Sequence, residues 1–366
     1  MKLISVFNNK GGVGKTTLTY HIAHALAEMG QKVLILDLDP QCNLTIYGVD
    51  PETLHTIWEQ EERFIDDFQA TRNKFTDSEF NLFNSNPRTI HYLLKPTEDG
   101  ISNLEHLPPP ISLANNLDLI PGRLTLHMYE NKISERWVSL YKGEPLSIRT
   151  ITQVRAIARR YGSERKYDFI IVDTSPSLGA LNKVVISTVD GFLIPCLPDM
   201  FSLYGIRNIG KSLLEWQKDF TRIYTFLSTE KRNEFPENFV RFLGFTIYNA
   251  KKYTGVTSSN LAQAASNYAD RIPQTVRDFI SLEVRKHLND EMLDHPIGGE
   301  AVMHTHNTLP SMAQKYRVPI WQVPDVATLE QTDKNTIKGN QRIYKATNSA
   351  YKTFTEDLLT RVSRLN

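Results

Sequence analysis

The sequence predicts a doubly wound α/β fold, in which helices flank a mostly parallel sheet. Short apolar runs of strand-forming residues recur along the 366 residues, and stretches with the apolar spacing of a helix separate them. The runs are continuously apolar rather than alternating, which is typical of strands buried on both faces of a parallel sheet. Strands that alternate with helices in this way are expected to be joined by right-handed crossovers.

The first fifty residues predict a strand, a glycine loop, a helix and a second strand. Residues 3–7 form a short apolar run, and residues 16–29 carry apolar side chains at the spacing of one helix face. Gly30 is placed to end this helix, and residues 33–36 form the next apolar run. This order of elements brings the glycine loop to the amino end of a long helix.

The rest of the chain predicts more strands of the same sheet together with helical insertions. Strands are expected at residues 117–120, 167–173, 190–195, 242–248 and 318–323. Helices are expected at residues 124–137, 148–160, 178–187, 275–288 and 348–362. Residues 50–87 are polar with scattered aromatic side chains, which predicts a helical insertion because disordered segments are poor in aromatics. We interpret residues 1–366 as a single domain.

The composition is that of an ordinary globular protein and excludes several classes. The formal net charge is +1, so any contact with nucleic acid or membrane must come from a local patch. Cys42 and Cys196 lie far apart in sequence and neither belongs to a Cys-x-x-Cys pair, which argues against a disulfide framework and a structural zinc site. The chain contains no run of about 18 apolar residues, so we expect no transmembrane helix and a cytoplasmic protein.

The glycine loop carries the clearest chemistry. It consists of Lys10, Gly11, Gly12, Val13, Gly14, Lys15, Thr16 and Thr17. Glycines allow backbone N–H groups to surround phosphate oxygens, and the helix that follows presents the positive end of its dipole to them. In such a loop the second lysine contributes its charge to the β- and γ-phosphates of a nucleotide, and the threonine hydroxyl after it is a ligand for Mg²⁺. The sequence therefore predicts a site for ATP and Mg²⁺.

Acidic residues follow two of the predicted strands. Asp37 and Asp39 come at the end of the second strand, and Asp173 ends the strand at residues 167–173. Carboxylates at the carboxyl edge of a parallel sheet can face a nucleotide-bound Mg²⁺ or an attacking water, although an aspartate before proline is also common in turns. We predict that Asp39 and Asp173, together with Thr16, form the magnesium site.

These motifs resemble those of the ParA/MinD (Soj-like) ATPases, which are deviant Walker A P-loop NTPases of the SIMIBI class. The resemblance is closest to the ParA branch. It rests on the lysine-first phosphate loop, on DLDPQ at residues 37–41 and on DTSPSLG at residues 173–179, with weaker blocks at residues 116–124, 189–206 and 242–255. Residues 50–87 and parts of 221–240 and 270–317 do not align with the family, and we interpret them as insertions.

The resemblance implies a sandwich dimer with two ATP molecules at its interface. Lys10, the additional lysine at the start of the loop, would contact the nucleotide of the partner subunit. Lys15 would hold the phosphates, Asp39 matches the residue needed for hydrolysis, and Asp173 matches the Walker B acid. The residues that match contacts to the adenine base are Asn249, Pro324 and Asp325.

The resemblance also implies partners and a cellular role. In the family, ATP binding drives dimerisation, the dimer binds DNA non-specifically, and a ParB-like or other stimulating protein triggers hydrolysis. A protein of this kind positions or partitions a DNA or protein cargo in the cytoplasm, often on the nucleoid. The chain departs from the pattern at Cys42, where the family usually has glycine, and after Pro324, where no basic residue follows.

Two alternatives to a DNA-positioning ATPase stay open. A switch or assembly ATPase in a larger regulatory or defence complex is favoured by the unaligned insertions, which could bind a partner. A MinD-like, membrane-cycling ATPase needs a terminal amphipathic helix rich in bulky apolar and basic residues. Residues 354–362 have an apolar face but also carry acids and continue a predicted core helix, so membrane binding is disfavoured.

Overall fold

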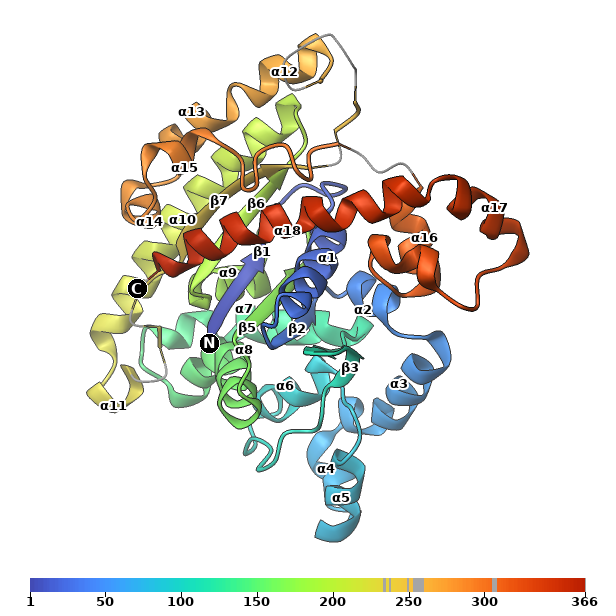
Figure 1. The fold of residues 1–366 in the computed structure, drawn as a ribbon. Coiled ribbons are helices and arrows are strands. Elements are labelled where there is room, and N and C mark those ends of the chain that lie inside the picture. Colours follow the sequence, from blue (N-terminus) through green and yellow to red (C-terminus); the bar gives the residue numbers. More distant parts are fainter. Residues whose placement is uncertain (233–234, 237, 249, 253–259, 305–307, 366) are drawn as a thin grey trace.

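The computed structural model describes residues 1–366 except 233–234, 237, 249, 253–259, 305–307 and 366 (Figure 1). The described residues form one seven-stranded sheet with the strand order β3-β4-β2-β5-β1-β6-β7. The strands are β1 (Lys2–Val6), β2 (Val33–Leu38), β3 (Ile111–Ala114), β4 (Leu117–Ile120), β5 (Phe169–Thr174), β6 (Gly191–Cys196) and β7 (Arg241–Ile247). All neighbouring strands pair in parallel except β3 and β4, so the predicted doubly wound, mostly parallel sheet is confirmed.

Alternate side chains along each central strand enter two separate cores, because successive residues of a strand point to opposite faces of the sheet. Leu34 and Leu36 belong to the core that includes α7 (His127–Leu140), α8 (Pro145–Arg165), α9 (Ala180–Thr188) and α10 (Met200–Phe226). Val33 and Ile35 belong to the core on the other face, with α1 (Lys15–Glu28) and α18 (Gln341–Ser363). Burial on both faces explains why these strands are continuously apolar in sequence.

Residues 51–98 form four helices below the sheet in Figure 1. They are α3 (Pro51–Asp66), α4 (Phe68–Arg72), α5 (Asp77–Asn84) and α6 (Ile90–Glu98). Caps define their starts: Asp50 accepts a hydrogen bond from the backbone of Thr53, and Thr76 and Glu79 form a capping box. The scattered aromatics gather around Phe64, whose ring lies 4.8 Å from that of Phe83 and 5.5 Å from that of Tyr92. These aromatic side chains therefore extend the core that lies on the α7–α10 face of the sheet.

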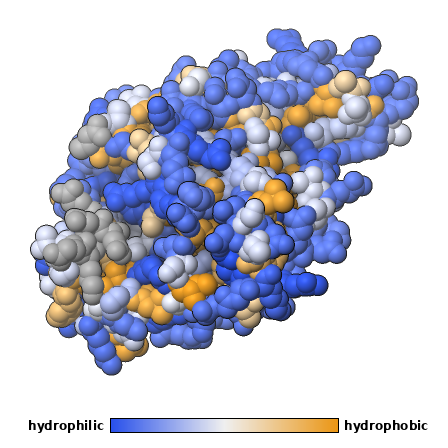
Figure 2. Space-filling view, turned by 90° about the horizontal axis from the view of Figure 1, so that it is seen from below, coloured by the Kyte–Doolittle hydropathy of each residue, from blue (hydrophilic) through white to orange (hydrophobic). Residues whose placement is uncertain are grey.

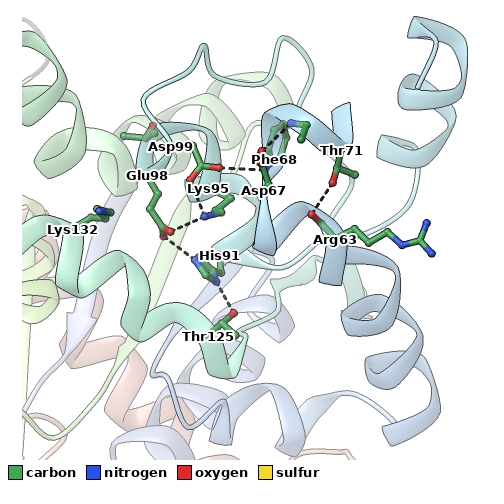
Figure 3. Close-up of polar contacts among 12 residues, drawn as sticks. Arg63, Asp67, Phe68, Thr71, His91, Lys95, Glu98, Asp99, Thr125 and Lys132 are labelled. Atoms are coloured by element: carbon green, nitrogen blue, oxygen red, sulfur yellow. Dashed lines mark hydrogen bonds and ion pairs between the residues drawn. The ribbon is translucent and has the colours of Figure 1, made fainter. Parts of the chain in front are cut away.

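A buried polar network fixes α6 against its neighbours (Figure 3). Glu98 Oε2 lies 3.0 Å from His91 Nε2, and Glu98 Oε1 accepts a hydrogen bond of 2.8 Å from Lys95 Nζ. Lys95 also pairs with Asp99 at 2.8 Å, and Asp99 in turn accepts from the backbone N–H of Phe68 in α4. Burial lowers the pKa of His91, although Glu98 opposes this shift. Each charge has a partner, as buried charges require, and the network ties α4 to α6.

The prediction of a strand at residues 318–323 is wrong. This segment forms η2 (Ile320–Asp325), a 3-10 helix that packs on α1 rather than on the edge of the sheet. The backbone N–H of Ile320 donates to His21 Nε2 at 3.1 Å, and Trp321 Nε1 donates to Glu28 at 2.6 Å. A short apolar run does not distinguish a strand from other buried segments, and Pro324 cannot donate to a sheet ladder.

The second half of the chain holds shorter helices that the sequence predicted only in part. The expected helix at residues 275–288 is divided into two helices, α13 (Ile272–Phe279) and α14 (Leu282–Arg285). The remaining helices are α2 (Asn43–Gly48), α11 (Thr229–Arg232), α12 (Gln263–Ala269), α13 (Ile272–Phe279), α14 (Leu282–Arg285), α15 (Asp290–Asp294), α16 (Leu309–Tyr316) and α17 (Gln331–Gly339), with a 3-10 turn η1 at Leu124–Leu126.

The surface seen in Figure 2 is mostly hydrophilic, and its hydrophobic residues form separate patches rather than one continuous area. Within the described part of the chain, every helix falls short of the length and apolarity that crossing a membrane would require.

Candidate functional site

The phosphate loop joins the carboxyl end of β1 to the amino end of α1, as its sequence predicts. Gly14 caps α1 in the left-handed region with φ of 82°, and Gly12 has φ of 73°. A Cβ atom added to Gly14 would lie 2.3 Å from the ring of Tyr248. Glycine is therefore required at position 14 both by its backbone conformation and by the close packing of Tyr248.

Lys15 and Thr16 begin α1 and point in different directions. Lys15 is buried, and its Nζ donates a 3.1 Å hydrogen bond to the carbonyl oxygen of Lys10 at the other end of the loop. Burial lowers the pKa of Lys15, while the charges of Asp173 and Asp39 oppose this shift. The Thr16 hydroxyl donates to Asp173 Oδ2 at 2.9 Å. This hydrogen bond connects the phosphate loop to Asp173, the acidic residue near the carboxyl end of β5.

The sheet register brings the acidic residues together. Asp37 of β2 lies directly opposite Asp173 of β5, and Asp39 follows two residues beyond Asp37. Burial raises the pKa of Asp37 to about 6, opposed by hydrogen bonds from Thr45, and the nearby charge of Asp39 raises it further. Burial, with the neighbouring charge of Asp37, also raises the pKa of Asp173 well above its usual value. A cation bound here would stabilise the ionised form of these carboxylates.

Asp37 and Asp39 have different roles in the structure. Asp37 Oδ2 accepts hydrogen bonds from the backbone and the hydroxyl of Thr45 at 2.9 and 2.6 Å, which fixes the turn between β2 and α2. Asp39 Oδ1 accepts from the backbone N–H of Gln41 at 3.0 Å, and its side chain lines the cavity at the phosphate loop. Asp37 is therefore a structural residue of the turn, and Asp39 is the one that faces the cavity.

A cavity of about 600 Å³ opens over the loop, a volume typical of small-molecule sites. The loop residues that line it are Gly11, Gly12, Gly14, Lys15, Thr16 and Thr17. Pro310, Ser311 and Gln314 of α16 line the opposite wall, which the sequence did not predict. Tyr47 positions this helix, because its hydroxyl donates to the carbonyl oxygen of Pro310 at 3.0 Å. No local pattern in residues 309–316 could have indicated this contact with a loop 300 residues earlier.

Lys10 is held by its own subunit. Its Nζ lies 2.5 Å from Asp199 Oδ2 and 5.4 Å from the centre of the Phe201 ring. Asp199 is also the N-cap of α10, since its other carboxylate oxygen accepts from the backbone N–H of Ser202. The Lys10 side chain is 21% exposed, and it does not belong to the lining of the cavity. A contact with a partner's nucleotide would require Lys10 to leave Asp199.

Pro324 and Asp325, two of the residues predicted to contact an adenine base, do not line this cavity. Pro324 and Asp325 lie in η2, away from the residues that line the cavity, and Asp325 pairs with Lys345 of α18. Asn249 falls outside the described residues. The contacts to the base therefore remain a prediction.

The residues present fit a magnesium ion shared with a nucleotide. Among the described residues, no group of three or more histidine, cysteine or acidic side chains could hold a metal ion on its own. Mg²⁺ is usually held by one or two carboxylates together with substrate phosphates and water, which matches this donor set. Thr16 and Asp173 meet at 2.9 Å beside Asp39, and burial disfavours the charge on Asp173 unless a cation is near.

The chain matches one known protein family and several curated proteins. Residues 1–224 match the AAA domain family. The chain is 31% identical over 209 residues to an uncharacterized protein of Methanocaldococcus jannaschii, a match that covers 57% of this chain and 63% of that protein. It is 25% identical over 298 residues to a ParA family protein of Mycoplasma genitalium, covering 79% of this chain and 93% of that protein. The match spans only 49 to 63% of the length of the first three curated relatives.

Solved structures share the fold. The structure of pNOB8 ParA bound to nonspecific DNA has a TM-score of 0.53 at 17% identity, and covers 99% of this chain and 98% of that one. The ATP complex of Cyanothece McdA has a TM-score of 0.56 at 16% identity, with 96% of both chains covered. The chain has the fold of the phosphate-loop nucleotide-binding proteins. It belongs to the AAA domain family, among the ParA/MinD-like ATPases.

Proposed function

We propose that this protein binds ATP with Mg²⁺, dimerises through the bound nucleotide, hydrolyses it and binds DNA non-specifically while dimeric. A ParB-like or other stimulating protein would trigger hydrolysis, and repeated cycles would position a DNA or protein cargo. The observation that carries the proposal is the cavity over the phosphate loop, which Lys15, Thr16 and Asp39 line, with the Thr16 hydroxyl bonded to Asp173.

The chemistry assigned to these residues is that of phosphoryl transfer to water. Lys15 would leave the carbonyl oxygen of Lys10 and neutralise the charge of the β- and γ-phosphates, and the backbone N–H groups of the loop would hold their oxygens. Thr16 and Asp173 would hold Mg²⁺, which supplies further positive charge to the phosphates when bound. Asp39 would orient the attacking water. Most of the catalysis would then come from positioning and charge neutralisation.

The dimer would depend on Lys10. A phosphate group carries more negative charge than the single carboxylate of Asp199, so a partner's triphosphate could compete for the Lys10 ammonium. Because the Lys10–Asp199 pair is partly exposed, solvent screens it and its loss would cost little. In this proposal Asp199 holds Lys10 in the free subunit and releases it when two subunits meet.

Binding to DNA is expected to require ATP. The support is the shared fold with pNOB8 ParA, whose structure was solved on nonspecific DNA, and the two exposed lysines Lys251 and Lys252 after β7. We expect a random-sequence duplex to bind in the presence of ATP and not of ADP, with a logarithm of affinity that falls linearly with the logarithm of salt concentration. Fluorescence anisotropy of a labelled duplex, at several salt concentrations, measures this.

The control for this experiment is the Lys15→Ala variant, which should bind DNA equally poorly with either nucleotide. Equal binding of wild type with and without ATP would contradict a nucleotide-controlled DNA cycle. The absence of binding at low salt would instead favour the switch or assembly ATPase, with α3, α4 and α5 as the surface for its partner.

A further inference from the structure

A second concave site lies at the opposite end of the sheet from the phosphate loop. Its volume is about 690 Å³, within the range of small-ligand pockets. Lys2 at the start of β1 and Arg241 at the start of β7 line it, whereas the phosphate loop follows the other end of β1. Five residues of a strand span roughly 16 Å, so the two cavities are separate. Met1 and Leu365, at the two ends of the described residues, also line it.

The lining of this second site is strongly basic. The basic side chains are Lys2, Arg155, Arg159, Arg241, Lys286 and Arg364. Among the described residues that line the pocket, Asp190 is the one carboxylate. The formal net charge of the whole chain is +1, so this concentration of positive charge is local. The six side chains come from parts of the sequence that lie far apart, and the fold brings them together.

Two carboxylates, Asp190 and Glu283, pair with three of these six basic side chains. Arg155 pairs with Asp190 at 2.9 Å, yet its Nε is buried without a hydrogen-bond partner. Glu283, which does not line the pocket, pairs with both Arg241 and Lys286. Burial lowers the pKa of Arg159, and the neighbouring charge of Arg155 lowers it further.

A histidine also lines this pocket, and two of the arginines act on it. His287 lines the pocket, and burial, with the charges of Arg241 and Arg364, lowers its pKa to about 4. The basic side chains of the pocket thus repel one another, and an anion bound inside would offset this repulsion.

We propose that this pocket binds a small ligand that carries two or more phosphate groups. Guanidinium groups bind phosphate through two parallel N–H donors. Four arginines and two lysines line the pocket. A concave pocket of about 690 Å³ suits a small molecule better than a DNA duplex, which would contact a broader surface. The ligand would join α8 to β7 and to the end of α18, far from the ATP cavity.

Inorganic tripolyphosphate is a suitable probe, provided that the phosphate loop is disabled. In the full-length Lys15→Ala protein, isothermal titration calorimetry should detect saturable binding of one tripolyphosphate that weakens with salt. The double variant Arg159→Ala/Arg364→Ala, in the same background, should bind about tenfold more weakly or worse, because each lost guanidinium removes charge-assisted hydrogen bonds. Circular dichroism checks that this variant is folded.

Arg342→Ala is the matched control, because Arg342 is an exposed arginine on α18 outside the pocket. It should leave tripolyphosphate binding unchanged. Binding should also raise the pKa of His287, which NMR titration of the imidazole measures. Failure of the Lys15→Ala protein to bind tripolyphosphate at low salt would overturn the proposal, as would equal losses in Arg342→Ala. A duplex that displaces the probe and depends on Arg159 and Arg364 would also overturn it. The Lys15→Ala background makes all these outcomes independent of the ATP cycle.

Discussion

Replacement of Lys15 by alanine should weaken the binding of ATP and ADP by at least about 100-fold, because removing one member of a buried charge pair typically costs several kcal/mol. Lys15 is the buried cation of the cavity, and it already reaches across the loop to the carbonyl oxygen of Lys10. Bound phosphates would occupy the space within this reach. Isothermal titration calorimetry with each nucleotide and Mg²⁺ measures the loss.

The fold should survive this change, since burial already disfavours the charged form of Lys15. Lys74→Ala is a suitable control, because Lys74 is an exposed lysine in the helical insertion and should not affect nucleotide binding. If the Lys15→Ala protein bound ATP within about threefold of wild type, phosphate binding would not take place at this loop.

Replacement of Asp39 by alanine should lower the rate of ATP hydrolysis by roughly 100-fold or more while ATP binding is retained, as expected for a group that assists the attacking water. Asp39 faces the cavity, and its carboxylate accepts a hydrogen bond from the backbone N–H of Gln41. Measurement of phosphate release, together with ATP affinity, separates catalysis from binding.

The neighbouring Asp37→Ala variant provides the contrast. Asp37 is fully buried and holds both polar groups of Thr45, so its loss should lower the melting temperature and leave Thr45 without an acceptor. Asp39→Ala should have a much smaller effect on melting. An Asp39→Ala protein that hydrolyses ATP at the wild-type rate would exclude Asp39 from the reaction.

Local sequence was sufficient to predict those elements whose determining contacts are close along the chain. The strand, loop and first helix follow from apolar spacing and from glycines that the φ angles at Gly12 and Gly14 require. The acids at the ends of β2 and β5 could be placed near each other because parallel strands end at one edge of the sheet.

Contacts between distant segments could not be predicted. The wall of the cavity at Pro310 and Gln314 depends on a hydrogen bond from Tyr47, and the η2 segment depends on donors and acceptors of α1. The Lys10–Asp199 pair joins residues 189 positions apart. The sequence identified Lys10 as unusual but gave no indication of what holds it in a free subunit.

The central claim is that ATP joins two subunits through Lys10, and the mass of the protein in solution tests it most directly. Light scattering coupled to size-exclusion chromatography, in an Asp39→Ala background that preserves ATP, should give a dimer with ATP and a monomer with ADP or without nucleotide. Adding Lys10→Ala should leave the protein monomeric under all three conditions, although it still binds ATP. A subunit that stays monomeric with saturating ATP, or a Lys10→Ala protein that dimerises as fully as its parent, would contradict the account.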